Sequence, residues 1–274
     1  AFARAAKAFS DNDAHAQRLY DYASKLWFMF STPILSNGGT TRGLPISCFL
    51  NYIEDSRSGL TGHYTENAFL SSVGGGVGGS WSDVRSVGSK TSNGSESTGV
   101  IPFMKVVDAE MLAFSQGVTR RGSYAAYLDI SHPEIEEFLD VRKPTGGDIN
   151  RKSVNLHHGV VISDKFMELI EQATRQAGFD DSWDLIDPHT KQVIKTVSAK
   201  TLWVKLIQNR VETGEPYIMF GDTVNAALPE FQKEMGLSVH HSNLCSEITL
   251  PTNEHRTAVC CLSSVNLEEF DEWK

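Results

Sequence analysis

The chain has 274 residues, 40% of them hydrophobic and 22% charged, and it carries a net charge of −9. These proportions are typical of a folded globular protein and exclude a chain that is disordered throughout. The acidic balance disfavours binding to nucleic acid polymers or anionic membranes, because both are negatively charged. No apolar stretch approaches the ~18 residues that a membrane span needs, and four cysteines are too few for a disulfide-rich secreted scaffold. We therefore expect a cytoplasmic protein without a membrane segment.

The first half of the chain is predicted to alternate between helices and glycine-rich or polar segments. Apolar residues at helical spacing predict helix within residues 1–30, and a Gly-, Ser- and Pro-rich stretch follows at 31–62. The other predicted elements of this half are a buried strand at 46–52, a helix at 64–73, a glycine run at 74–79, a polar loop at 86–99, a helix at 101–116, a loop at 115–124, a strand at 125–130 and a short helix at 133–140.

The second half continues the alternation of strands and helices. Its predicted elements are a strand at 154–162, a helix at 164–176 capped by Ser163 or Asp164, an irregular stretch at 178–196, a helix at 199–213, and short strands at 217–220, 247–250 and 257–264. Repeated alternation of this kind favours the α/β class.

Five of the six residues at 74–79 are glycines. The simplest interpretation is a flexible turn. A phosphate-binding Walker A loop is excluded because no Gly-Lys-Ser/Thr follows, and a dinucleotide fingerprint is disfavoured because no long helix follows. The glycines also permit the backbone to approach a bound ligand closely, so that exposed N–H groups meet its sugar or base.

The four cysteines form no Cys-x-x-Cys pair, which argues against structural zinc, and we predict no metal site. Buried inert thiols are one interpretation. Cys245 favours another, because Asn243 precedes it by two residues and Glu247 follows it by two. In an extended loop the three side chains share one side, and together they can bind a polar substrate, supply sulfur chemistry and move a proton.

Cys260 and Cys261 are adjacent on a predicted strand. Because side chains alternate across a strand, only one of the two can face a given cavity. The cysteine that does so could meet Cys48 on a neighbouring strand, provided that the two Cα atoms come within disulfide distance.

Six segments together resemble the large catalytic subunit of ribonucleotide reductase, most closely its class I form. In family order they are S-T-P-I-L at 31–35, I-S-C at 46–48, G-G-V-G at 75–78, S-Q-G at 115–117, S-N-L-C-S-E-I with L-P-T within 242–252, and C-C-L-S-S-V-N-L at 260–267. The resemblance implies an α/β fold: a helical segment at 1–30, then the first part of a ten-stranded α/β barrel with a central finger loop at 31–274. The C-terminal half of the barrel is expected to be missing, which would leave the chain inactive alone.

The resemblance also implies roles for the active-site residues. Cys245 resembles the cysteine that becomes a thiyl radical and takes hydrogen from ribose C3′. Cys48 and Cys260 resemble the redox pair that ends as a disulfide, and we expect them on neighbouring parallel strands, although Cys261 is an alternative partner of Cys48. Glu247 resembles the carboxylate that takes the 3′-hydroxyl proton, and Asn243 the amide near the 2′-hydroxyl. The positions that match substrate-lining residues are Thr32, Ser47, Gly75 and Gly76.

A second set of positions resembles the site of a nucleoside triphosphate effector. Asp55 and Ser56 resemble residues that hold its base and sugar, and Arg85 an arginine that binds its phosphates. Residues 89–94 would form the first specificity loop and residues 115–122 the second. In the second loop, Gln116 and Arg120 would link the effector to the base of the substrate. The alternative interpretation of Arg120 is a charged side chain in solvent.

The resemblance implies that the chain itself binds no cofactor apart from the effector. Its implied partners are a ribonucleotide substrate, the missing C-terminal half, a small subunit whose metal site generates the radical, a thioredoxin- or glutaredoxin-type reductant, and a second copy in a homodimer. Two other interpretations remain. One is a class II relative that uses adenosylcobalamin as its radical source. The other is a non-catalytic nucleotide-binding regulatory module. A long distance from Cys48 to both Cys260 and Cys261 would favour that interpretation.

Overall fold

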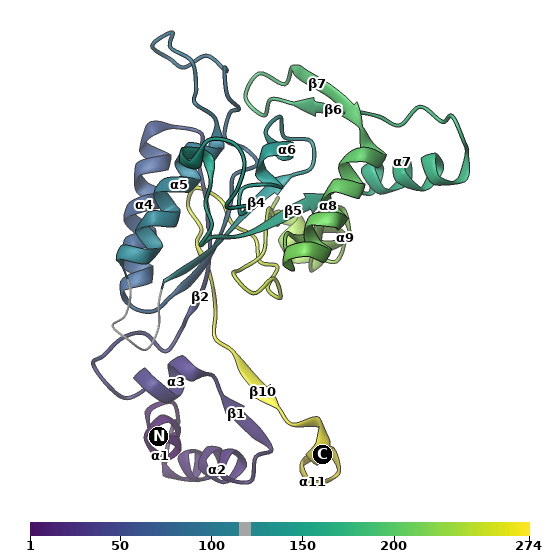
Figure 1. The fold of residues 1–274 in the computed structure, drawn as a ribbon. Helices are drawn as coiled ribbons and strands as arrows, with labels where there is room; N and C mark the ends of the chain where they lie inside the picture. Colours follow the sequence, from purple (N-terminus) through teal and green to yellow (C-terminus); the bar gives the residue numbers. More distant parts are fainter. Residues whose placement is uncertain (115–121) are drawn as a thin grey trace.

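The computed structural model describes residues 1–114 and 122–274, so Gln116 and Arg120 lie outside the described residues, as does most of the predicted loop at 115–124. A larger body contains the main sheet, and a smaller body contains the N-terminal helices (Figure 1). In the described part of the chain, no helix combines the length and the apolar character that a membrane span requires.

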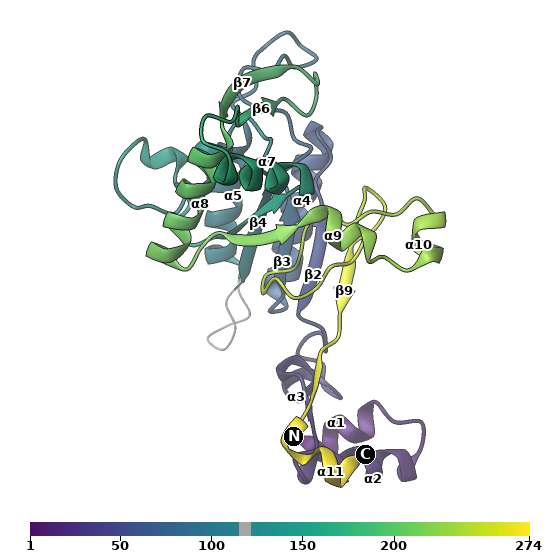
Figure 2. The same cartoon turned by 90° about the vertical axis from the view of Figure 1, so that its right-hand side faces the viewer.

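Five parallel strands form the main sheet of the larger body. They are β2 (Cys48–Tyr52), β3 (Gly76–Ser80), β4 (Ser123–Asp129), β5 (His157–Ile162) and β8 (Tyr217–Phe220). A sixth strand, β9 (Ala258–Cys260), pairs antiparallel with β2, and the order across the sheet is β8-β5-β4-β3-β2-β9. Figure 2 shows β9 beside β2 at the edge of this sheet.

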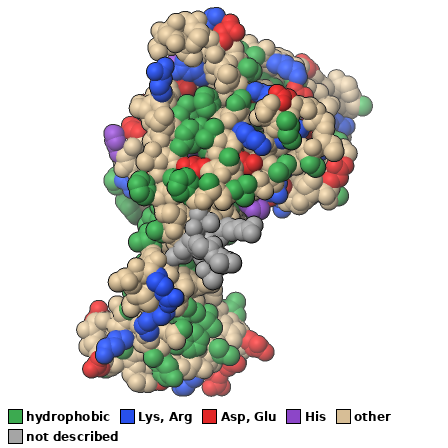
Figure 3. All heavy atoms as spheres, turned by 60° about the vertical axis from the view of Figure 1, so that its left-hand side comes forward, with side chains coloured by type: hydrophobic (Ala, Val, Ile, Leu, Met, Phe, Trp, Pro, Cys, Tyr) green, Lys and Arg blue, Asp and Glu red, His purple; other side chains and the backbone are tan. Residues whose placement is uncertain are grey.

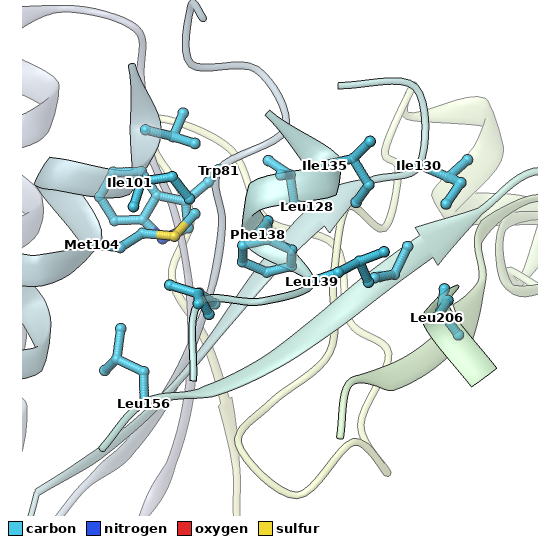
Figure 4. Packing of buried hydrophobic residues seen from close by; sticks show 14 of the residues in the cluster. Trp81, Ile101, Met104, Leu128, Ile130, Ile135, Phe138, Leu139, Leu156 and Leu206 are labelled. Carbon is cyan, nitrogen blue, oxygen red and sulfur yellow. The ribbon is translucent and has the colours of Figure 1, made fainter. Parts of the chain in front are cut away.

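Helices pack on one face of the sheet. They are α4 (Arg57–Ser72), α5 (Val100–Ala113), α6 (Ile135–Phe138), α7 (Asp164–Arg175) and α8 (Ala199–Thr213). The core between sheet and helices is closely packed around fully buried side chains such as Trp81, Met104 and Phe138 (Figure 4). Burial of each such side chain contributes about 1.5–3 kcal/mol, so this core accounts for much of the stability of the larger body.

Several smaller elements surround the sheet. They are a hairpin of β6 (Ser182–Ile186) and β7 (Val193–Ser198) and the short helices η1 (Ile149–Arg151), α9 (Gly221–Ala226) and α10 (Glu230–Glu234). The C-terminal η2 (Leu267–Glu269) and α11 (Phe270–Trp273) lie away from the sheet, at the end of the chain near the smaller body (Figure 1). The loop between α10 and β9 lies against the face of the sheet opposite the helices, because Gly76 and Gly78 contact it while Val77 enters the helix-side core.

The smaller body has its own core. It comprises α1 (Phe2–Ala8), α2 (Asp13–Ser24), β1 (Phe28–Phe30) and α3 (Thr32–Asn37), with Ala5, Ala6, Ala23, Phe30 and Ile34 buried between them. The chain returns to it near its other end, where β10 (Ser263–Val265) pairs antiparallel with β1. Figure 3 shows the two bodies from the side of α4 and α5.

The α/β prediction is confirmed, but four local predictions are wrong. Residues 1–30 are not helical throughout: Asn12 caps a new helix by accepting from the His15 N–H, and residues 28–30 form a strand. The glycine run is a turn only at its start, at Gly74, because residues 76–80 form the strand β3. The stretch at 178–196 contains a hairpin, and residues 247–250 form no strand.

Candidate functional site

Cys48 and Cys260 lie opposite one another in the register of β2 and β9. Directly opposed residues of an antiparallel pair have Cα atoms about 4.5–5.5 Å apart, which is within reach of a disulfide. The predicted parallel orientation is wrong, because the long loop before β9 reverses the direction of the chain. Cys48 is buried, Cys260 is half-buried and Cys261 is exposed. Burial raises the pKa of the Cys260 thiol, and the nearby Cys48 and Glu247 raise it further.

The glycines of β3 create room for the segment at 241–248, here called the finger loop. A Cβ atom on Gly78 would lie 2.0 Å from the carbonyl oxygen of Ser242, and one on Gly76 would lie 2.6 Å from the Leu244 side chain. Any other residue would therefore push the loop away from the sheet. The close approach expected of this glycine run is made to a segment of the chain itself.

Asn243 organises the finger loop from within. Its side-chain oxygen accepts hydrogen bonds from the backbone N–H groups of Glu247 and Ile248, each at 3.1 Å. The Tyr127 hydroxyl donates to the Asn243 carbonyl oxygen at 2.8 Å, which ties the loop to β4. Asn243 is fully buried, yet its Nδ2 has no hydrogen-bond partner among the residues that the structure describes. A buried unpaired donor is costly, so a polar partner for this nitrogen would stabilise the loop.

His241 fixes the start of the same loop. Its Nε2 lies 3.0 Å from the carbonyl oxygen of Gly78 and donates to it. Complete burial lowers the pKa of His241 to about 3, so the ring is neutral at physiological pH. A neutral donor in the loop, bonded to β3, therefore anchors the loop without adding a charge beside the thiols.

Cys245 and Glu247 lie on the exposed side of the finger loop. Burial raises the pKa of Tyr217 on β8, and the nearby Glu215 and Cys245 contribute to that rise. Glu247 in turn contributes to the raised pKa of Cys260. Cys245 thus lies near Tyr217 of β8, and Glu247 lies near Cys260 of β9.

The predicted substrate residues do not all lie together. Ser47 and Gly76 adjoin Cys48: the Gly76 N–H donates to the Ser47 carbonyl at 2.7 Å, and Gly76 is the β3 partner of Cys48. A Cβ on Gly75 would instead meet the Phe49 ring and the backbone of α4. Thr32 is exposed at the start of α3, in the smaller body.

Apart from the thiol site, a hollow of about 780 Å³ lies where β2 and β3 end and α4 begins. Its lining includes the predicted effector residues Asp55, Ser56 and Arg85. Arg85 Nε lies 2.9 Å from Asp55 Oδ2, and its Nη1 donates to the Lys90 carbonyl at 2.7 Å. Ser56 caps α4 by accepting from the Gly59 N–H at 2.9 Å. We call this hollow the effector pocket, after the role predicted for these three residues.

The polar loop at 86–99 forms one wall of the effector pocket, through Thr91, Ser92 and residues 96–98. Residues without any sequence motif hold this loop. Asp187, in the turn between β6 and β7, accepts from the Ser86 N–H at 2.9 Å and from its hydroxyl at 2.6 Å. Glu134, after β4, accepts from the N–H groups of Val87 and Val100. Only tertiary structure brings these carboxylates to the loop, so motif spacing could not reveal them.

The fold and the site together define part of an α/β barrel protein with a clustered thiol site and a separate pocket. Comparison with protein families identifies it further: residues 46–274 match the barrel domain of ribonucleotide reductase, and residues 1–43 match its all-alpha domain. The chain belongs to the ribonucleotide reductase family.

Similar proteins carry matching names. The putative ribonucleoside-diphosphate reductase large subunit of Frog virus 3 is 52% identical over 94% of this chain and 43% of that protein. The large subunit of Invertebrate iridescent virus 3 is 45% identical over 99% of this chain and 50% of that protein. Among solved structures, the class Id ribonucleotide reductase alpha subunit of Actinobacillus ureae matches with a TM-score of 0.79 and 35% identity, over 99% of this chain and 45% of that one. The chain thus spans half or less of the length of these relatives.

Proposed function

We propose that this chain forms part of the catalytic subunit of a class I-like ribonucleotide reductase, which reduces ribonucleotides to deoxyribonucleotides. The observation that carries the proposal is the finger loop seated on β3, which exposes Cys245 and Glu247, with Glu247 near Cys260 of the facing pair Cys48 and Cys260. The relatives are named for ribonucleoside diphosphates, so a ribonucleoside diphosphate is the proposed substrate class.

The proposed chemistry divides the work among these side chains. A small subunit supplies the oxidising equivalent that converts the Cys245 thiol to a thiyl radical, which takes the hydrogen atom from ribose C3′. Glu247 accepts the 3′-hydroxyl proton, and the 2′-hydroxyl leaves as water after a thiol protonates it. Cys48 and Cys260 supply two electrons and become a disulfide, and Cys245 returns its hydrogen atom to C3′. An external thioredoxin- or glutaredoxin-type reductant would restore the pair.

Two details of the site support this division. The raised pKa of Cys260 keeps its proton on sulfur at neutral pH, as a proton donor to the leaving hydroxyl requires. The Nδ2 of Asn243 would gain the partner that it lacks if the loop moved to let a ribose hydroxyl reach it. Ser47 and Gly76, next to Cys48, would line the substrate, and Gly75 and Thr32 would lie farther along its site.

A nucleoside triphosphate is the proposed occupant of the effector pocket. Asp55 and Ser56 would hold its base and sugar and Arg85 its phosphates, because a planar guanidinium pairs well with phosphate oxygens. Gln116 and Arg120 are proposed to link the identity of the bound effector to the choice of substrate base.

The proposed assembly includes the rest of the barrel, the small subunit and a second copy of the chain. Exposed apolar side chains on the face of α4 and α5, such as Phe69 and Leu112, support a homodimer through that face (Figure 3). A cytoplasmic setting suits the chemistry, because it keeps unpaired thiols reduced.

The test is Cys245→Ser in the complete enzyme with its radical source. We expect no deoxynucleotide above background, because the O–H bond of serine is too strong for the same radical relay. Cys261→Ser is the matched control and should retain activity. Normal turnover by Cys245→Ser would overturn the mechanism, and activity that depends on adenosylcobalamin would favour a class II enzyme.

A further inference from the structure

We propose that Glu134, which lies outside the effector pocket, is a positioning residue that fixes both ends of the 86–99 loop and thereby sets the affinity of the pocket for a nucleoside triphosphate. The part of this inference that concerns affinity rests on the proposed effector site. The contacts of Glu134 with the two ends of the loop, here called the clamp, lie within the protein and do not involve the ligand.

One carboxylate oxygen joins the two ends of the loop. Glu134 Oε2 accepts from the Val87 N–H at 3.2 Å and from the Val100 N–H at 3.0 Å. Glu134 is only 4% exposed, so water cannot replace either bond easily. His132, just after β4, holds the segment that carries Glu134. Its Nε2 donates to the Val84 carbonyl, and its Nδ1 accepts from the Glu134 N–H.

Gly99 shows how closely the carboxylate is fitted to the loop. Its φ of +82° lies in the left-handed region, and a Cβ there would lie 2.3 Å from Glu134 Oε1. Gly99 is also the N-cap of α5 and offers no side-chain cap. Glu134 therefore caps α5 from another segment, where a negative charge favours the helix N-terminus.

Arg151 completes the clamp and balances its charge. Its Nη2 donates to Glu134 Oε1 at 3.2 Å, and its Nη1 donates to the Thr98 carbonyl at 3.3 Å. Thr98 itself lines the effector pocket. The ion pair thus holds the loop at three positions, Val87, Thr98 and Val100.

Between these positions the loop is a short hairpin closed by its own hydrogen bonds, from the Gly88 N–H to the Ser97 carbonyl and from the Ser97 N–H to the Ser89 carbonyl, but few of its side chains are buried. Most residues from 88 to 98 are exposed, and the loop's internal contacts include the bridge between Lys90 and Glu96 and the turn from Thr91 to Ser95. A segment with few buried contacts opens at low free-energy cost unless its ends are held. Loss of the clamp therefore allows the 86–99 loop to move away from the pocket, while the sheet keeps its structure.

The experiment compares Glu134→Gln with two matched controls in the full chain, with dTTP as the probe and calorimetry as the readout. Glu137→Gln removes another partner of Arg151, and Asp108→Asn removes another buried carboxylate, bonded to Asn155 and remote from the loop. We expect Glu134→Gln to weaken dTTP binding about tenfold or more, as loss of a charged hydrogen-bond acceptor would. Both controls should bind within about twofold of the wild type. A purely structural role would lower the stability of Glu134→Gln and Asp108→Asn alike, and leave affinity unchanged in both.

Amide hydrogen exchange at Val87 and Val100 provides a readout that needs no ligand. Both amides should exchange faster in Glu134→Gln and at the wild-type rate in the controls. If Glu134→Gln fails to fold, Arg151→Gln tests the same clamp, because it removes the partner of Glu134 Oε1 and of the Thr98 carbonyl.

Arg85→Ala distinguishes a wrong assignment of the effector site from a wrong role for Glu134. Weak binding by Arg85→Ala with unchanged binding by Glu134→Gln would overturn the affinity claim and leave the effector site standing. Unchanged binding by Arg85→Ala would overturn the effector site and, with it, the affinity claim. Unchanged exchange at Val87 and Val100 in Glu134→Gln would overturn the clamp whatever the ligand does.

Discussion

Gly78 is where the sheet and the finger loop come into direct backbone contact. Gly78→Ala would place a methyl group 2.0 Å from the Ser242 carbonyl and 2.8 Å from the Asn243 Cα. Since both neighbours are backbone atoms, the loop must move, and we expect a loss of about 1–3 kcal/mol in the free energy of unfolding. Chemical denaturation measures this loss, and deoxynucleotide formation by the complete enzyme should fall with it.

Gly62→Ala is the control for that substitution. Gly62 lies inside α4, and a Cβ there meets no atom within 4 Å. The change should stabilise the chain by up to about 1 kcal/mol, because alanine favours a helix over glycine. Equal effects of the two substitutions would contradict a close contact at Gly78.

The adjacent thiols Cys260 and Cys261 should differ in reactivity. Cys261 is exposed, whereas Cys260 is half-buried and its pKa is raised. Because the thiolate is the reacting form, iodoacetamide near pH 8 should modify Cys261 first, and mass spectrometry gives the order. Under oxidation the mapped disulfide should join Cys48 to Cys260. A bridge between Cys48 and Cys261 would contradict the strand register.

The residues of the thiol site could be predicted because each belongs to a short motif. Asn243, Cys245 and Glu247 are spaced at two residues, and that spacing was visible without a structure. The choice between Cys260 and Cys261 needed the register of β2 and β9. Glu134 and Asp187 could not be predicted, because their importance depends on loop contacts with residues 34 and 101 positions away.

Among the elements, the β6–β7 hairpin provides a pH-dependent test. Burial alone would raise the pKa of Asp187, but hydrogen bonds from Ser86 and Thr190 outweigh it and lower the pKa to about 2. An unfolded aspartate has a pKa of about 3.9. Asp187 therefore contributes stability above about pH 4 and loses it as the pH falls toward 2.

Asp187→Asn should accordingly lower the melting temperature most at pH 7, with a difference from wild type that narrows below pH 4. Asp184→Asn, on β6 of the same hairpin, is the control: Asp184 is exposed and accepts from Thr196 Oγ1. A difference for Asp187→Asn that stays constant from pH 7 to pH 3 would contradict this assignment.

Elements with a strong local pattern were predicted well, and α8 and β8 have the predicted bounds. The errors arise where distant contacts override local patterns. Residues 247–250 are β-prone, but the Asn243 side chain takes the N–H groups of Glu247 and Ile248 that a sheet would use. The strand at 28–30 was missed because its only partner in the described sheets is β10, near the other end of the chain.

At the scale of the whole molecule, the β1–β10 pair connects the N-terminal body to the end of the chain. Ser264 is the partner of Met29 in this pair. Ser264→Pro should disrupt the pairing, because proline lacks the N–H group of a strand. We expect faster amide exchange at residues 28–30 and unchanged exchange in β4, and Ser264→Ala as a control should change neither. Faster exchange in β4 as well would indicate that the two bodies unfold as one unit.

The same pairing has a consequence for synthesis on the ribosome. Phe28 pairs with Val265, which lies 237 positions further along the chain. At roughly 5–20 residues per second, β1 waits roughly 10–50 s for its partner to be made. During that time the nascent chain presents an unpaired strand edge, the kind of surface that invites association with other chains. We therefore expect translation speed and chaperone supply to influence how much of this protein folds productively.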